Sequence, residues 1–327
     1  MTHSALGAAA GGGAGADGAP PDWAPCSDRS RERGDALGAT GGLGRRWLLV
    51  EIDGPWGPHA FLDSALDREL GRAIALRAEG AGLRPVAIRR YGLRADQRRE
   101  RTSLRWAIAE TRPGREQIRW GTVSDPAELL ELPLDGSAGE PSEHPAYLVC
   151  THARHDRCCA VRGRPVAASL AAAYSEETWE CSHLGGDRFA ATMILLPHGL
   201  YYGRVPAESA PDIASAYQRG LLVPEHFRGR SAMSLAAQAA ENHARARLGE
   251  HRLDAITLRA EEPGTGDEPT TVHLLHGTDE IVVTLRERWT EPLLSTCGAR
   301  VPFPVRRYEA VSMRADTAPA DRDHPSS

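Results

Sequence analysis

The chain has 327 residues, a formal net charge of −5 and a hydrophobic content of 41%, which is ordinary for a globular protein. Its negative charge argues against broad affinity for nucleic acid. All 39 basic residues are arginine, which excludes a P-loop lysine, a kinase-type lysine and a Schiff-base lysine.

The cysteines and the apolar runs further limit the class of protein that the sequence can encode. Six cysteines, clustered and unevenly spaced in a chain of this length, do not indicate a secreted disulfide framework. No window approaches the roughly 18 apolar residues of a transmembrane helix. The Ala-, Gly- and Pro-rich start lacks the basic and apolar regions of a signal peptide. We therefore expect a cytoplasmic protein that binds neither membranes nor nucleic acid.

Hydrophobic periodicity predicts the elements in chain order. Residues 1–44 are expected to be a disordered or extended N-terminal segment. An N-terminal α/β unit, 45–140, follows, and within it the stretch 133–145 is a candidate linker. The predicted elements of this unit are a strand at 46–52, a helix at 63–81, and strands at 84–90, 103–110 and 116–122.

The second unit, 141–222, is predicted to have the order β-α-β-β-β-α. Its helix is expected at 163–174, where Gly163, Arg164 and Pro165 place a proline near the first turn. A C-terminal α/β extension, 223–313, and a disordered tail, 314–327, complete an α/β (α+β) fold with a mixed sheet. The remaining predicted elements are strands at 146–150, 177–182, 191–196 and 199–205, a helix at 207–220, a helix at 230–248, and strands at 253–260, 270–276, 280–287 and 306–312.

Residues 150–187 gather most of the side chains that bind metals or carry redox chemistry. Thiolates together with an imidazole select zinc, copper or an iron–sulfur cluster over magnesium or calcium. The candidate metal ligands and their neighbours are Cys150, Cys158, Cys159, Cys181, His183 and Asp187.

The spacing of the first cysteines favours a large object. Cys150 and Cys159 form a C-x8-C pair, whereas zinc knuckles use C-x2-4-C and thioredoxin-type dithiols use C-x-x-C. A wide loop of this kind suits a two-iron cluster. Cys158 and Cys159 are adjacent, so their side chains diverge; we expect one ligand from the pair and prefer Cys159.

The second half of the motif contains a Gly-Gly pair between His183 and Asp187. Gly185 and Gly186 allow positive φ, which lets His183 and Asp187 face one object. Histidine in place of cysteine on one iron is the Rieske arrangement and raises the reduction potential. If Cys181 and His183 lie on one strand, their side chains point to the same face.

These stretches resemble the sucrase/ferredoxin-like family, whose ferredoxin domain has a thioredoxin-like fold. The similar segments are CTHARHDRCCAVRGRP (150–165), WECSHLGGDRFA (179–190), LLPHGLYYGRV (195–205) and WLLVEIDGPWG (47–57), with a looser likeness at STCGARVPFPVRRYEAV (295–311). The resemblance covers about 45–312. It implies a [2Fe–2S] cluster bound between C-x8-C and H-x3-H, which carries over to Cys150, Cys159 and His183. It does not imply glycosidase activity, despite the word sucrase.

The chain departs from this pattern at the second histidine position, which Asp187 occupies. The fourth ligand is then either Asp187, through oxygen, or Cys181. A thiolate is the better match to ferric iron in a sulfide cluster, so the sequence slightly favours Cys181.

Three functions follow as hypotheses. The leading one is a [2Fe–2S] protein that acts in electron transfer or redox sensing, an electron carrier more than an enzyme with its own substrate. A second is a thiol oxidoreductase that uses Cys158 or Cys159, whose thiol pKa nearby arginines would lower. A third is a cluster-free structural or zinc-binding scaffold.

Other residues have ordinary interpretations beside these. A buried free cysteine is usually a small apolar side chain, which is the role expected for Cys26 and Cys297. His152 and His155 are expected at the surface or in packing. One group of arginines is either a solvated face or a basic rim that steers an acidic redox partner protein; it consists of Arg154, Arg157, Arg162 and Arg164.

Overall fold

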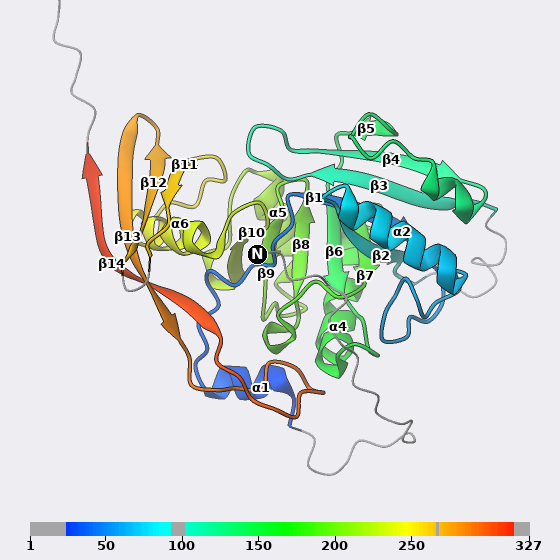
Figure 1. Cartoon of the computed structure of the whole chain (residues 1–327), viewed down its shortest axis with the longest axis horizontal. Coiled ribbons are helices and arrows are strands. Elements are labelled where there is room, and N and C mark those ends of the chain that lie inside the picture. The colour runs from blue at the N-terminus through cyan, green and yellow to red at the C-terminus, as the bar shows by residue number, and fades with distance from the viewer. Residues whose placement is uncertain (1–23, 93–101, 266–267, 317–327) are drawn as a thin grey trace, which may run out of the picture.

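The computed structural model describes residues 24–92, 102–265 and 268–316. Within them the chain forms a mixed α/β structure with two sheets (Figure 1). The larger sheet has ten strands in the order β10-β9-β8-β6-β7-β2-β1-β3-β4-β5, and the smaller has four in the order β11-β12-β13-β14. The expected mixed-sheet α/β class is therefore confirmed.

The first half of the large sheet is built from the N-terminal unit. Strand β1 pairs parallel with β2 and antiparallel with β3, and β3 pairs antiparallel with β4. Helix α2 packs its buried Ile74 and Ala78 against this half. The bounds are β1 Arg46–Glu51, α2 Arg68–Gly80, β2 Arg84–Arg90, β3 Leu104–Glu110, β4 Gln117–Val123 and β5 Glu140–Ser142.

The second half repeats this arrangement. Strand β6 pairs parallel with β7 and antiparallel with β8, and β8 pairs antiparallel with β9. The order β-α-β-β-β-α predicted for 141–222 is present here when β10 is left out. The bounds are β6 Ala146–Cys150, α4 Arg157–Ala173, β7 Thr178–Cys181, β8 Met193–Leu196, β9 Leu200–Tyr202, α5 Ala210–Gln218 and β10 Phe227–Arg230.

The two halves join through an antiparallel pairing of β2 with β7, in which Ile88 lies opposite Cys181. One sheet therefore runs across the expected boundary between the units at 140. The halves have the same strand order and the same strand directions about this junction.

The large sheet is strongly curled. Aromatic side chains from strands that are far apart in the strand order contact each other, which a flat sheet would not allow. Trp120 of β4 stacks on Trp179 of β7 with ring centroids 5.3 Å apart, and Trp47 of β1 lies 6.3 Å from Tyr201 of β9. In Figure 1, β3 and β4 run across the direction of β6 and β8. The apolar core inside this curl contains side chains of both halves, and Cys150, Cys159 and Cys181 belong to it.

The small sheet packs on helix α6 through a separate apolar core. A buried charge network ties α6 to the large sheet: Glu241 of α6 lies 2.9 Å from the guanidinium groups of both Arg230 and Arg245. The bounds are α6 Leu235–Leu248, β11 Ile256–Glu262, β12 Thr270–His276, β13 Asp279–Trp289 and β14 Arg306–Asp316. None of the helices in the described ranges has the length and apolar character that crossing a membrane requires.

Two local expectations differ from the structure. Helix α4 begins at Arg157, because the Asp156 side chain accepts the Cys158 N–H and caps the helix, and Pro165 lies inside it. The segment 24–44, expected to be disordered or extended, includes helix α1 (Cys26–Glu32), whose Cys26 and Ser30 are buried. Both features bring cysteines to the same end of the large sheet.

The ends of the chain fall partly outside the described residues. Residues 1–23 and 317–327 of the expected N-terminal segment and C-terminal tail lie there. The described start of that tail, 314–316, belongs to β14.

A close approach of α4 to β6 makes Gly163 necessary. A Cβ at this position would lie 2.1 Å from the carbonyl oxygen of Cys150. Gly163→Ala should therefore destabilise the fold by about 1–3 kcal/mol through overpacking, measured as a lower urea midpoint. Gly80→Ala, in a helix with open space around it, is the control and should be neutral or stabilising by up to about 1 kcal/mol. Equal stability of the two variants would contradict the close approach.

Candidate metal centres

The first turn of α4 directs two adjacent cysteines to different sites. Successive residues on an α-helix are separated by about 100° around its axis, so the side chains of Cys158 and Cys159 diverge. Cys159 meets Cys150, at the end of β6. Cys158 meets Cys26 and Cys297. The described residues contain no disulfide among the six cysteines, all of which are free thiols.

The first site, here called the Cys–His site, consists of Cys150, Cys159, His183 and Asp187. The thiols of Cys150 and Cys159 are in hydrogen-bond contact. Asp187 Oδ1 accepts a hydrogen bond from Cys159 Sγ at 3.2 Å and lies 3.0 Å from His183 Nδ1. Three of the sequence-predicted ligands and the aspartate that replaces a histidine are thus brought together.

The charges at this site are coupled. The hydrogen bond from Cys159 lowers the pKa of the Cys150 thiol and raises that of Cys159, and burial raises the Cys159 value further. Burial alone would lower the pKa of His183, but the Asp187 carboxylate raises it. Burial alone would raise the pKa of Asp187, but His183 lowers it. A proton therefore favours the histidine over the carboxylate in the metal-free site.

The atoms of this site are suited to metal binding. His183 Nδ1 is buried and has no aligned hydrogen-bond partner among the described residues, although Asp187 lies close. The Asp187 carboxylate is almost entirely buried, with 2% of its side chain exposed. With Asp187 Oδ1 3.0 Å away, His183 Nδ1 pairs with the carboxylate, and it becomes available as a metal ligand when it loses its proton.

Cys181 occupies a neighbouring position. It lies opposite Cys150 in the parallel pairing of β7 with β6, and residues in register on adjacent strands share a face of the sheet. Its side chain is completely buried, and burial raises the pKa of its thiol well above the usual value. The structure records no hydrogen bond from the Cys181 thiol to Cys159, His183 or Asp187, whereas Asp187 contacts both Cys159 and His183.

His155 is exposed, as expected, and it also lies beside the Cys–His site. Its ring lies 3.8 Å from the His183 ring, centroid to centroid, and its Nε2 lies 3.8 Å from Asp187 Oδ2. His155, His183 and Asp187 together offer ligand atoms within 4.8 Å of one another. His155 precedes Cys159 by four residues but lies before the start of α4 at Arg157, so helical periodicity does not place it beside the site.

The histidines of this site border an open cleft of about 1120 Å³. His152, His155 and His183 lie on one side of it, and arginines that include Arg45 and Arg72 contribute positive charge elsewhere in the lining. The cysteines of the site are buried behind these rings. The Cys–His site therefore has a buried thiol side and a histidine side that faces the cleft.

A buried arginine holds the Gly-Gly turn that precedes Asp187. Gly185 and Gly186 both have positive φ, and a Cβ at Gly186 would lie 2.1 Å from the Arg228 side chain. Arg228 donates hydrogen bonds to the Gly185 carbonyl at 3.1 Å and to Thr192 Oγ1 at 3.3 Å. Burial lowers its pKa to about 10.

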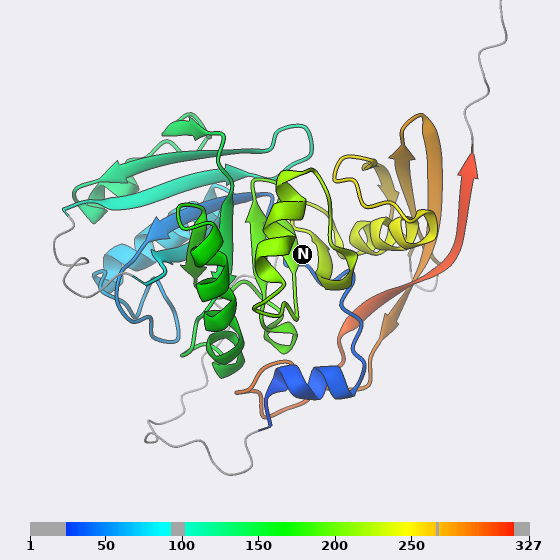
Figure 2. The ribbon, with the colours of Figure 1, turned by 180° about the vertical axis from the view of Figure 1, so that it is seen from behind.

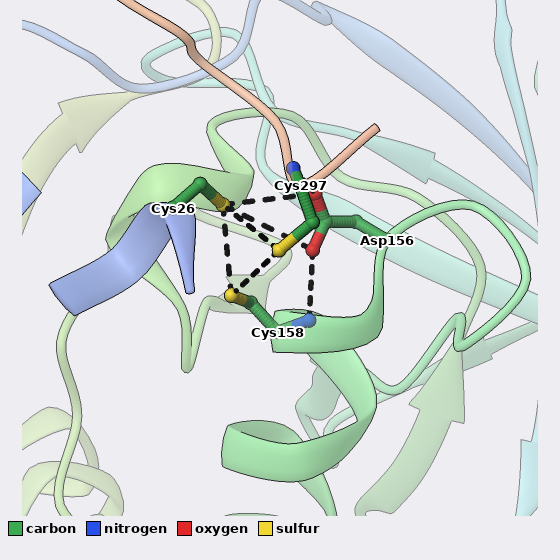
Figure 3. A group of neighbouring side chains, drawn as sticks. All are labelled: Cys26, Asp156, Cys158 and Cys297. Carbon is green, nitrogen blue, oxygen red and sulfur yellow. Dashed lines mark hydrogen bonds between the residues drawn. The ribbon is translucent and has the colours of Figure 1, made fainter. Parts of the chain in front are cut away.

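The second site, here called the three-cysteine site, consists of Cys26, Asp156, Cys158 and Cys297 (Figure 3). Cys26 Sγ and Cys158 Sγ are 3.6 Å apart, Cys26 and Cys297 are 3.6 Å apart, and Cys158 and Cys297 are 3.0 Å apart. These residues could bind a metal ion. Cys26 and Cys297 were expected to be ordinary packing residues, and no local pattern reveals them, because they are 132 and 139 residues from Cys158.

The thiols of the three-cysteine site do not share protons equally. Hydrogen bonds from Cys26, Cys297 and Ser27 lower the pKa of Cys158 to about 2, against the effect of burial. The contact with Cys158 raises the pKa of Cys26 well above its usual value and that of Cys297 to about 12. Cys158 is the thiol that is most readily deprotonated, as expected at a helix N-terminus.

Substitution of Arg228 tests how the Gly-Gly turn is held. Arg228→Met should lower the free energy of unfolding by about 2 kcal/mol or more, because it leaves a buried carbonyl and a hydroxyl without donors. Arg219→Met, at the exposed C-cap position of α5, should change the free energy of unfolding by about 0.5 kcal/mol or less. Urea unfolding of both variants measures the difference, and similar midpoints would show that Arg228 does not hold the turn.

A comparison with protein families matches the part of the chain that contains the cysteine and histidine motifs. The model of the sucrase/ferredoxin-like family matches residues 45–229, more than half of the chain. Curated proteins and solved structures gave no match. The matched range contains the Cys–His site and Cys158 but neither Cys26 nor Cys297, and it ends before α6. The chain therefore belongs to the sucrase/ferredoxin-like family.

Proposed function

We propose that the Cys–His site holds a [2Fe–2S] cluster and that the protein acts in electron transfer or redox sensing. The observation that carries the proposal is the convergence of Cys150, Cys159 and His183 in one buried place, with Asp187 in contact with two of them. Membership of the sucrase/ferredoxin-like family supports it. The topology of the 141–222 unit is compatible with the thioredoxin-like domain that the family resemblance implies.

The residues divide into two pairs of ligands. Cys150 and Cys159 would bind one iron as thiolates, and His183 would bind the other through Nδ1. The contacts favour Asp187 as the fourth ligand over Cys181, the residue that the sequence slightly favoured, because Asp187 lies beside both Cys159 and His183. His155, close to the outer carboxylate oxygen, would orient the aspartate as an outer-shell partner.

When bound, a [2Fe–2S] cluster supplies reversible one-electron transfer at a potential set by its ligands, burial and hydrogen bonds. The chain contributes a buried thiol side that excludes water and a histidine side that faces the cleft. We propose that a redox partner docks at this cleft. The exposed Arg45 and Arg72 in its lining would favour an acidic partner.

One observation favours a second candidate. His155, His183 and Asp187 form a set of two histidines and one carboxylate within 4.8 Å, a combination typical of mononuclear non-haem iron sites. Acid-labile sulfide separates the two candidates, because only the cluster contains it. The thiol oxidoreductase hypothesis has less support, since Cys158 and Cys159 are both buried and a reactive thiol needs access.

Anaerobic purification with metal and sulfide analysis tests the proposal. We expect about two irons and two acid-labile sulfides per chain and a brown protein with visible absorption. A single iron without sulfide would indicate the mononuclear site instead. Absence of iron from protein produced with iron and cluster-assembly factors would overturn both.

Substitutions assign the ligands. Cys150→Ser and Cys159→Ser should each abolish the visible spectrum, and Cys158→Ser should leave it largely intact, because only the first two thiols face the Cys–His site. For the fourth ligand, Asp187→Ala should destroy or strongly destabilise the cluster, whereas Cys181→Ala should leave it in place.

Asp187→His tests the same position by restoring the family pattern. We expect this variant to keep a cluster and to show a second proton-linked inflection in its reduction potential, since a second imidazole ligand titrates. Cluster loss in Cys181→Ala, with retention in Asp187→Ala, would assign the fourth ligand to the thiolate.

A further inference from the structure

The three-cysteine site joins three parts of the chain that are remote in sequence. Cys26 lies on α1, Cys158 on the first turn of α4, and Cys297 on the connection between β13 and β14. In Figures 1 and 2, α1 and this connection lie side by side near the start of α4. Both peripheral segments are outside the residues that the family model matches.

The sulfur separations suit a single ion. Four ligands at the Zn–S distance of about 2.3 Å in a tetrahedron place neighbouring sulfurs about 3.8 Å apart. The observed separations of 3.0–3.6 Å are slightly smaller. A disulfide needs about 2.05 Å, and ligands of a two-iron cluster would lie on two metals and be spread more widely. The three thiols thus surround a volume that fits one metal ion.

Asp156 closes the fourth side. Its Oδ2 lies 3.6 Å from Cys26 Sγ. Its carboxylate also accepts the backbone N–H of Cys158 at 2.8 Å and that of Cys297 at 2.7 Å. These bonds fix the carboxylate relative to two of the three thiols, an orientation of the kind that outer contacts provide in metal sites.

We propose that Cys26, Cys158, Cys297 and Asp156 bind one structural Zn²⁺ ion. Three thiolates with one oxygen ligand give a closed four-coordinate set, and structural zinc sites are closed in this way. Binding releases the protons of the thiols to solvent, so that zinc affinity falls as pH falls. This site is independent of any iron at the Cys–His site.

The expected role is to fasten α1 and the 290–305 connection to the start of α4, at the end of the large sheet that carries the Cys–His site. Without the ion, the backbone N–H of Cys297 still donates a hydrogen bond to Asp156 at the start of α4. The contacts of α1 with α4 include the exposed Asp28–Arg162 ion pair, 2.6 Å long, and exposed pairs contribute little. With the ion, the turn of α4 that carries Cys159 is also fixed, because Cys158 is the adjacent residue.

Zinc and iron contents of matched variants test the proposal. We expect about one zinc per wild-type chain after purification without chelators. Cys297→Ser, at a partly exposed position, should lose the zinc. Its circular dichroism should still show a folded protein. Cys150→Ser is the matched control: it should keep the zinc whatever happens to iron.

Two further readouts keep the result unambiguous. Zinc loss should expose the segment 290–305 to limited proteolysis, and added Zn²⁺ should restore protection in the wild type but not in Cys297→Ser. Undiminished zinc in Cys297→Ser, or a zinc-free wild type, would overturn the proposal. Iron in place of zinc would also overturn it, as would a Cys158–Cys297 disulfide detected by intact mass after reduction and removal of the reductant. Absence of iron and sulfide alone would count only against the proposed [2Fe–2S] function.

Discussion

The first turn of α4 is the constraint on which the rest of the site depends. Asp156 caps this turn by accepting the Cys158 N–H, and the helical twist then sends Cys158 and Cys159 to opposite sites. Four residues of the segment 155–159 thus serve the two centres: His155 and Cys159 face the Cys–His site, and Asp156 and Cys158 face the three-cysteine site.

The curl of the large sheet supplies the burial that such thiols need. Because β4 reaches β7 and β1 reaches β9 through their aromatic side chains, the ends of β6 and β7 lie against a closed apolar core. Burial raises the pKa of Cys181 and opposes ionisation of Cys150, but hydrogen bonds and the helix start favour the thiolates of Cys150 and Cys158. Hydrogen bonds therefore lower the pKa of these two thiols against the effect of their apolar surroundings.

The sequence predicted the parts of this arrangement that depend on local pattern. Strand periodicity located β6 and β7, the divergence of adjacent residues predicted a single ligand from Cys158 and Cys159, and the C-x8-C pattern favoured Cys159. The start of α4 was placed six residues late, because a proline suggested a first turn and the Asp156 cap carried no stronger local signal. Cys26 and Cys297 were not connected to Cys158, since contacts across more than 130 residues leave no mark on spacing.

X-ray diffraction from crystals of the as-isolated protein, recorded at the iron and the zinc absorption edges, tests the central claim most directly. The account predicts two separate anomalous peaks: an iron peak bounded by Cys150, Cys159 and His183, and a zinc peak bounded by Cys26, Cys158 and Cys297. A single metal shared between the two groups of cysteines, or Cys158 and Cys159 directed to one metal, would contradict it.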